Sequence, residues 1–179
     1  MSKVIRFRLD SRSIQGAIRE IEAYKRRLSE IGREICERLA KEVGLEEAKI
    51  RFESAIYDGV NDVKVTVEQT ENGYRVVAFG NAVAFIEFGT GVHYNAGVSY
   101  PLEKPSGIVG IGEYGYKQGK KDEWRYNGDP GTNGESRTSS SGETYVVTHG
   151  NPAQMPMYNA LTAMQGEVER IVREAFRNA

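Results

Sequence analysis

One carboxylate, Glu87, lies inside an apolar run and is the residue whose chemistry most needs an explanation. Residues 81–91 read Asn-Ala-Val-Ala-Phe-Ile-Glu-Phe-Gly-Thr-Gly, so Ile86 and Phe88 flank the carboxylate. A carboxylate there must lie at an exposed edge or accept hydrogen bonds that offset its desolvation. It could bind backbone N–H groups of its own turn at 89–91, pair with a cation on another subunit, or act as a general acid or base. The adjacent turn favours the first role.

Two histidines, His93 and His149, stand at the two ends of a Gly-rich tract and could approach Glu87. Neither has the His-x-x-His or His-Glu spacing that holds ligands on one element, so we predict solvent-facing loop histidines and no metal. The same three residues are those that a hydrolase or nucleic-acid-processing enzyme would use. That enzyme remains the alternative function, and no cofactor is predicted.

Other chemically suggestive residues have simpler interpretations. Cys36 lies between Ile35 and Leu39 on a predicted helix, where a buried, inert thiol is expected. Gly-x-Gly occurs at 89–91 and 110–112, but without a Walker Lys-Ser/Thr and without a clear strand-to-helix context. Neither nucleophilic catalysis nor phosphate binding is therefore indicated.

A short aromatic and basic cluster, Trp124-Arg125-Tyr126, follows three lysines and has the composition of a single-strand nucleic-acid binder. Acidic residues at Asp122, Glu123 and Asp129 offset its charge. The cluster is therefore a better candidate for a contact with a protein partner.

Composition sets the bounds on fold and compartment. The chain has 179 residues, 39% of them hydrophobic, which suits a single domain over 1–179. Its 24 Lys and Arg against 25 Asp and Glu give no overall basic surface for DNA or anionic lipid. One cysteine indicates a reducing cytosol, and every apolar run is shorter than the ~18 residues of a membrane span.

The first third of the chain is predicted to be mostly helical. Residues 1–12 alternate apolar and charged side chains, which indicates an arm or short strand. Over 13–56, after an N-cap at Asp10, Ser11 or Ser13, apolar residues recur at helical spacing, and Gly44 is the expected C-cap before a second, shorter helix. We expect the apolar stripe to pack on the protein's own sheet, and a contact with another subunit is the alternative. The spacing does not favour a coiled coil.

The middle of the chain, 62–90, is predicted to form a hairpin and a hinge. Valines alternate with polar residues from Val63 to Val67, and Asn72-Gly73 suits a type I′ turn. The returning strand, 74–79, is apolar on both faces, which predicts a central strand covered by helix on one side. Residues 82–88 fit a third strand or a short buried helix.

The last part of the chain is predicted to form a long loop excursion followed by a helix. Residues 91–150 are rich in Gly, Ser and Asn, with local structure expected at 107–116 and a short strand at 143–148. A helix is predicted over 156–177 with Pro156 at its first position. The fold class is therefore α+β: a small antiparallel sheet packed against a long N-terminal helix and a C-terminal helix, with a long loop excursion.

Two signatures give the chain a family resemblance. The first is Phe-Ile-Glu-Phe-Gly-Thr-Gly at 85–91, and the second is Gly-Asn-Pro-Ala-Gln-Met-Pro-Met-Tyr-Asn-Ala-Leu at 150–161. They resemble the head–tail joining (neck, tail-completion) proteins of tailed phages and prophages, the "gene product ten" family of HK-type lambdoid siphophages. The extra residue before Pro156, Met157 in place of Phe and the long excursion depart from that pattern. The signature residues are Phe85, Glu87, Phe88, Gly89, Thr90, Gly91, Pro152, Pro156, Met157 and Tyr158.

The resemblance implies a non-enzymatic virion protein at the head–tail junction, made in the host bacterial cytoplasm. Such a protein would form a homo-oligomeric ring that contacts other neck, connector and tail proteins, and DNA would pass through without being bound specifically. We further expect the tract from Val92 to His149 to be variable in the monomer and to become ordered against a neighbouring ring.

Overall fold

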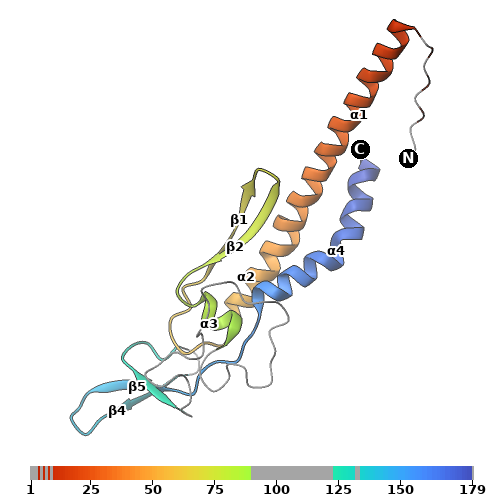
Figure 1. Ribbon diagram of the computed structural model, residues 1–179. Coiled ribbons are helices and arrows are strands. Elements are labelled where there is room, and N and C mark those ends of the chain that lie inside the picture. Colours follow the sequence, from red (N-terminus) through yellow and green to blue (C-terminus); the bar gives the residue numbers. More distant parts are fainter. Residues whose placement is uncertain are drawn as a thin grey trace.

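The computed structural model describes residues 4, 6, 8, 10–89, 123–131 and 134–178, with the side chains of Trp124 and Asn178 excepted. The fold is α+β, as predicted, and is elongated (Figure 1). Thr90, Gly91, His93 and the structure expected at 107–116 lie outside the described residues. The elements are α1 (Ser11–Arg38), η1 (Leu39–Gly44), α2 (Leu45–Glu53), β1 (Lys64–Thr70), β2 (Gly73–Phe79), α3 (Val83–Phe88), β3 (Trp124–Tyr126), β4 (Glu135–Thr138), β5 (Thr144–Thr148) and α4 (Pro156–Asn178).

The first helices form one rod without the predicted break. Asp10 caps α1, because its carboxylate accepts a hydrogen bond from Ser13 N at 2.9 Å. The chain then passes through the π-helical segment η1 directly into α2, and Gly44 has a helical φ of −61°. The predicted C-cap is therefore wrong. A Cβ at Gly44 would lie 2.5 Å from Met164 Sδ and 2.8 Å from Val76 Cγ2, so this glycine allows close packing.

The hairpin is confirmed. β1 pairs antiparallel with β2 in the register Lys64↔Phe79 to Thr70↔Gly73, so Glu71 and Asn72 form the turn. The predicted type I′ turn at Asn72-Gly73 is wrong, because Gly73 belongs to β2 and Asn72 does not have a positive φ. Helix covers one side: Val76 approaches η1 at Gly44, and Ala78 packs against the core cluster. The prediction of a central strand is wrong for the described residues, where β2 pairs with β1 alone and Phe79 is half exposed.

The end of the predicted excursion carries its own sheet. β5 pairs with both β3 and β4, giving the antiparallel order β3-β5-β4. The strand predicted at 143–148 is thus confirmed as β5, whose Val146 and Val147 are buried. This sheet lies at the end of the molecule opposite the start of α1 (Figure 1).

α4 begins at Pro156, as predicted, and packs along the helical rod against η1, α2 and the C-terminal part of α1. Its buried face includes Ile171 and Ala175. Arg38 of α1 donates to Glu174 of α4 at 2.8 Å, an ion pair that lowers the pKa of the Glu174 carboxyl. Below this helical layer, a core cluster of Phe52, Ala55, Ala82 and Ile86 joins α2 to α3.

The apolar stripe of α1 is only half used in the fold, so the prediction that it packs on the protein's own sheet is wrong for its first half. Ile31 is the buried residue of this helix, whereas every residue from 18 to 30 is exposed. The helix projects beyond the rest of the described molecule (Figure 1). Cys36 is also exposed, which corrects the expected buried thiol, because it faces away from the packed side of the helix.

Candidate structural and assembly site

The site is the place where α3 meets the start of α4, and Asp62 fixes the position of α3. Its carboxylate accepts hydrogen bonds from the backbone N–H groups of Asn81 and Ala82, each at 2.9 Å. These bonds lower the pKa of the Asp62 carboxyl. The prediction left a strand or a helix open for 82–88, and Val83–Phe88 forms the helix α3. Asp62 holds the two residues that precede this helix, and Gly80 turns the chain with a φ of +140°.

Glu87 binds the N-terminus of α4. The side chain is 3% exposed, and its Oε2 accepts from Met157 N at 2.8 Å while its Oε1 accepts from Tyr158 N at 3.1 Å. The first residue, Pro156, has no N–H to satisfy, and Met155, which precedes it, has no capping oxygen in its side chain. Glu87 therefore supplies from 70 residues away the cap and the negative charge that a helix N-terminus favours.

The sequence predicted that Glu87 would bind backbone N–H groups of its own turn at 89–91, and Thr90 and Gly91 of that turn lie outside the described residues. Gly89 N instead donates to Phe85 O at 3.0 Å, which closes the last turn of α3. The carboxylate accepts from backbone N–H groups of α4. The predicted kind of partner, backbone N–H groups, is thus confirmed, but the sequence did not indicate that Met157 and Tyr158 supply them.

Gly89 allows the two signature segments to touch. Its φ is +77°, and a Cβ would lie 2.7 Å from Ala153 N and 2.8 Å from Asn151 O. Just before it, Ile86 O accepts from Gln154 N at 3.0 Å. Only glycine combines this backbone conformation with so close an approach. The first signature therefore packs directly on the second.

Four residues that the sequence reasoning did not name as site residues complete the junction. Gln154 clamps the backbone of Ile56, accepting from its N–H at 3.1 Å and donating to its carbonyl at 2.6 Å. Asn151 Oδ1 accepts from Asp58 N at 3.1 Å, and the Thr148 hydroxyl donates to the Asp58 carboxylate. Asn151 and Gln154 lie inside the second signature, and that signature was the sequence feature that could have identified them as site residues.

The junction therefore ties together three segments: the turn at 55–58, α3, and residues 148–158. Phe85 adds to it by stacking on Tyr57, with ring centroids 6.3 Å apart. Met157 packs against the core cluster, and Pro156 is fully buried. Pro152 is exposed and shapes the chain between Asn151 and Gln154.

The chemistry available to Glu87 is limited by this arrangement. A general acid or base must reach a substrate proton, but both oxygens of this buried carboxylate face helix N–H groups. His149 is exposed, as predicted for a loop histidine. Within the described ranges, no group of three or more His, Cys, Asp or Glu could hold a metal ion.

The predicted partner-contact cluster lies on and around β3. The Arg125 guanidinium lies 4.8 Å from the centroid of the Tyr145 ring, a cation–π contact. The Tyr126 hydroxyl donates to Asp129 O at 2.8 Å, and burial raises its pKa. The side chain of Trp124 lies outside the described atoms. Contact with a partner through this cluster stays a prediction.

No family model, curated protein or solved structure matches this chain. In the part of the chain that the structure describes, no helix is long and apolar enough to span a bilayer.

Proposed function

We propose that this protein is a structural virion-morphogenesis protein at the phage head–tail junction, where it forms or joins a ring between the head connector and the tail tube. Its partners are other neck, connector and tail proteins, and it acts in the virion after assembly in the host cytoplasm. The proposal rests on the resemblance of the two signatures to the head–tail joining family.

One observation carries the non-enzymatic part of the proposal. The signature carboxylate, Glu87, is buried and bonded to the backbone of the second signature at Met157 and Tyr158. Glu87, the residue that most suggested catalysis, thus bonds α3 to α4. A signature that builds a scaffold is expected of an assembly protein, whereas an enzyme needs a carboxylate that substrate can reach.

The test is electron microscopy of particles from a prophage that lacks this gene. We expect DNA-filled heads and separate, unjoined tails, and joined virions on complementation with the wild-type gene. Normal virions from the deleted prophage would overturn the proposal. Complementation with Glu87→Gln distinguishes the structural role from the alternative enzyme. In the structural role, any loss of joined virions should match the loss of folded protein. A variant that folds fully but loses a catalytic turnover would favour the enzyme.

A further inference from the structure

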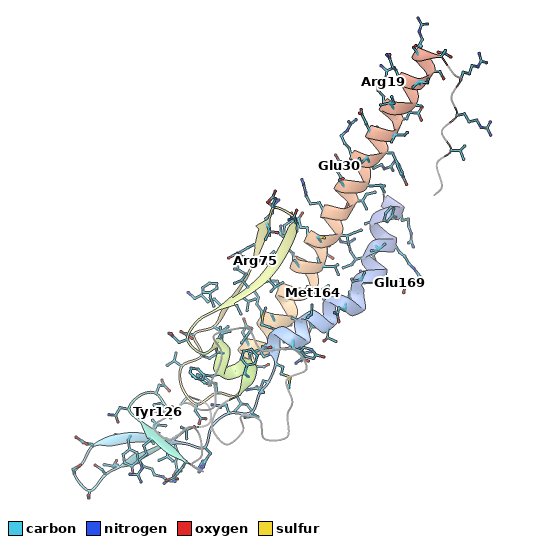
Figure 2. All side chains as sticks on the ribbon, in the orientation of Figure 1. Arg19, Glu30, Arg75, Tyr126, Met164 and Glu169 are labelled. Carbon is cyan, nitrogen blue, oxygen red and sulfur yellow. The ribbon has the colours of Figure 1, made fainter. Side chains whose placement is uncertain are left out.

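The projecting half of α1 has two properties together, an apolar stripe and a basic charge. Ile14, Ile18, Ile21 and Leu28 are 38–54% exposed, although they continue the line of the buried Ile31. Residues 11–28 of the helix hold five Lys and Arg against two Asp and Glu, and the preceding residues 1–10 hold three against one, so residues 1–28 have a net charge of +5. Figure 2 shows Arg19 on this projecting part. A free-standing helix with exposed isoleucines indicates a surface that a partner covers.

The rest of the molecule has the opposite charge. Residues 29–179 hold sixteen Lys and Arg against twenty-two Asp and Glu, a net charge of −6. The excess is concentrated over residues 42–62, with six acidic and two basic residues. The near-neutral total of the chain therefore conceals a basic end and an acidic body.

The same acidic segment exposes apolar side chains. Ile50 on α2 is 61% exposed, and Ile56 and Val60 in the following turn are 54% and 64% exposed. Glu46 and Glu53 lie four residues before and three after Ile50, so all three share one exposed face of α2. This face complements the α1 stripe in apolar surface and in charge. Its apolar side chains are flanked by acidic residues, whereas those of the α1 stripe are flanked by arginine and lysine.

We propose that the projecting half of α1 docks on the exposed α2 face, Glu46-Ile50-Glu53 with the turn at 56–60, of a second copy of this chain. The two surfaces belong to different parts of the same straight rod and cannot meet within one molecule (Figure 1). The contact therefore joins two different surfaces of two copies, and when it repeats head-to-tail it builds a ring if the rotation between subunits closes. This inference supplies the subunit contact of the proposed ring and so rests on the proposed function.

The test is native mass spectrometry and sedimentation of the purified 179-residue chain. An α1 variant carries Ile18→Asp, Arg19→Glu and Arg26→Glu, and an α2 variant carries Glu46→Arg, Ile50→Asp and Glu53→Arg. The control is Arg173→Glu, an exposed charge reversal on α4, an element that belongs to neither proposed surface. We expect the wild type and the control to form oligomers, and each of the two variants to be monomeric with self-association weakened by about 100-fold or more.

A mixture of the two variants distinguishes pairing of α1 with α2 from pairing of α1 with α1 or of α2 with α2. The α1 variant keeps an intact α2 face and the α2 variant keeps an intact α1 stripe, so a mixture should form one contact and stop at a heterodimer. Recovery of that dimer also shows that both variants are folded.

Several outcomes would overturn the inference. They are a wild type that stays monomeric at millimolar concentration, an α2 variant that still assembles, or a mixture that forms no heterodimer. Binding of the wild type to DNA that the α1 variant loses, without self-association, would assign the basic end to nucleic acid instead. These measurements need no virion, so they are independent of the prophage experiment. The self-association can be absent while the deleted prophage still gives unjoined heads and tails. It can also be present while the deleted prophage gives normal virions.

Discussion

The two ends of the α1–η1–α2 rod show two different uses of apolar and charged residues. At the α2 end, Glu87, Gln154 and Asn151 are bonded to backbone groups of distant segments, and a buried cluster surrounds them. At the α1 end, every residue from 18 to 30 is exposed. The first region contributes to the stability of the monomer. The second region has apolar side chains that stay 38–54% exposed, which is expected where a partner completes the packing.

The largest loss of unfolding free energy is expected from Glu87→Ala. This change leaves two N–H groups at the start of α4 without their partner and removes the negative charge beside the helix N-terminus, so we expect a loss of about 4 kcal/mol of unfolding free energy. Urea unfolding followed by circular dichroism measures it. Glu87→Gln should lose less, because one amide oxygen can still accept.

The matched control is Glu169→Ala on the exposed side of α4 (Figure 2), whose ion pair with Arg173 is solvent-exposed. It should change the unfolding free energy by less than about 0.5 kcal/mol. Equal effects of Glu87→Ala and Glu169→Ala would remove the distinction between the two regions.

A pair of isoleucine substitutions tests the comparison within one helix. Ile31→Ala deletes a side chain that is 6% exposed and should cost about 3 kcal/mol, whereas Ile18→Ala, at 49% exposure, should cost less than about 1 kcal/mol in dilute monomer. Unfolding at low micromolar concentration measures both. A large cost for Ile18→Ala that persists on dilution would mean that the α1 stripe packs within the monomer.

Gly89→Ala tests the close approach of the two signatures. We expect a loss of about 3 kcal/mol, from both the positive φ and the contact with residues 151–153. Gly142→Ala is the control, because Gly142 has a φ of +84° with no atom near its would-be Cβ. Its cost should be about 1 kcal/mol, from backbone conformation alone. If the two substitutions cost the same, the steric contact at Gly89 does not matter.

The smallest expected effect is a pH dependence from Asp62. Because its pKa is lowered in the folded protein, it contributes stability above its ordinary value of 3.8, and this contribution is lost as the pH falls through the lower folded pKa. Wild type should therefore exceed Asp62→Asn in urea midpoint at pH 6, and the difference should shrink between pH 4 and pH 2.5. A difference that stays constant over this range would contradict the stabilising role of the Asp62 carboxylate bonds to Asn81 and Ala82.

Sequence reasoning succeeded where the determining residues are close together along the chain. Asp10 caps α1, Pro156 starts α4, and β1 and β2 form a hairpin, as predicted. The capping side chain, the fixed φ of proline and the alternation of the strands are local causes, so the sequence pattern contains them. The predicted type I′ turn at Asn72-Gly73 is the local exception, because the turn falls on Glu71 and Asn72.

The remaining features depended on which distant segments meet. The sequence determined that Glu87, an ionised group in an apolar run, needs backbone donors, but the donors at Met157 and Tyr158 are 70 and 71 residues away. In the same way, Gly44 suits a helix end by local preference, and only the packing of Met164 and Val76 against it explains a continuous helix. The sequence by itself thus determined what each residue requires, and the tertiary structure decided which segment meets the requirement, because desolvation and close packing act across space and not along the chain.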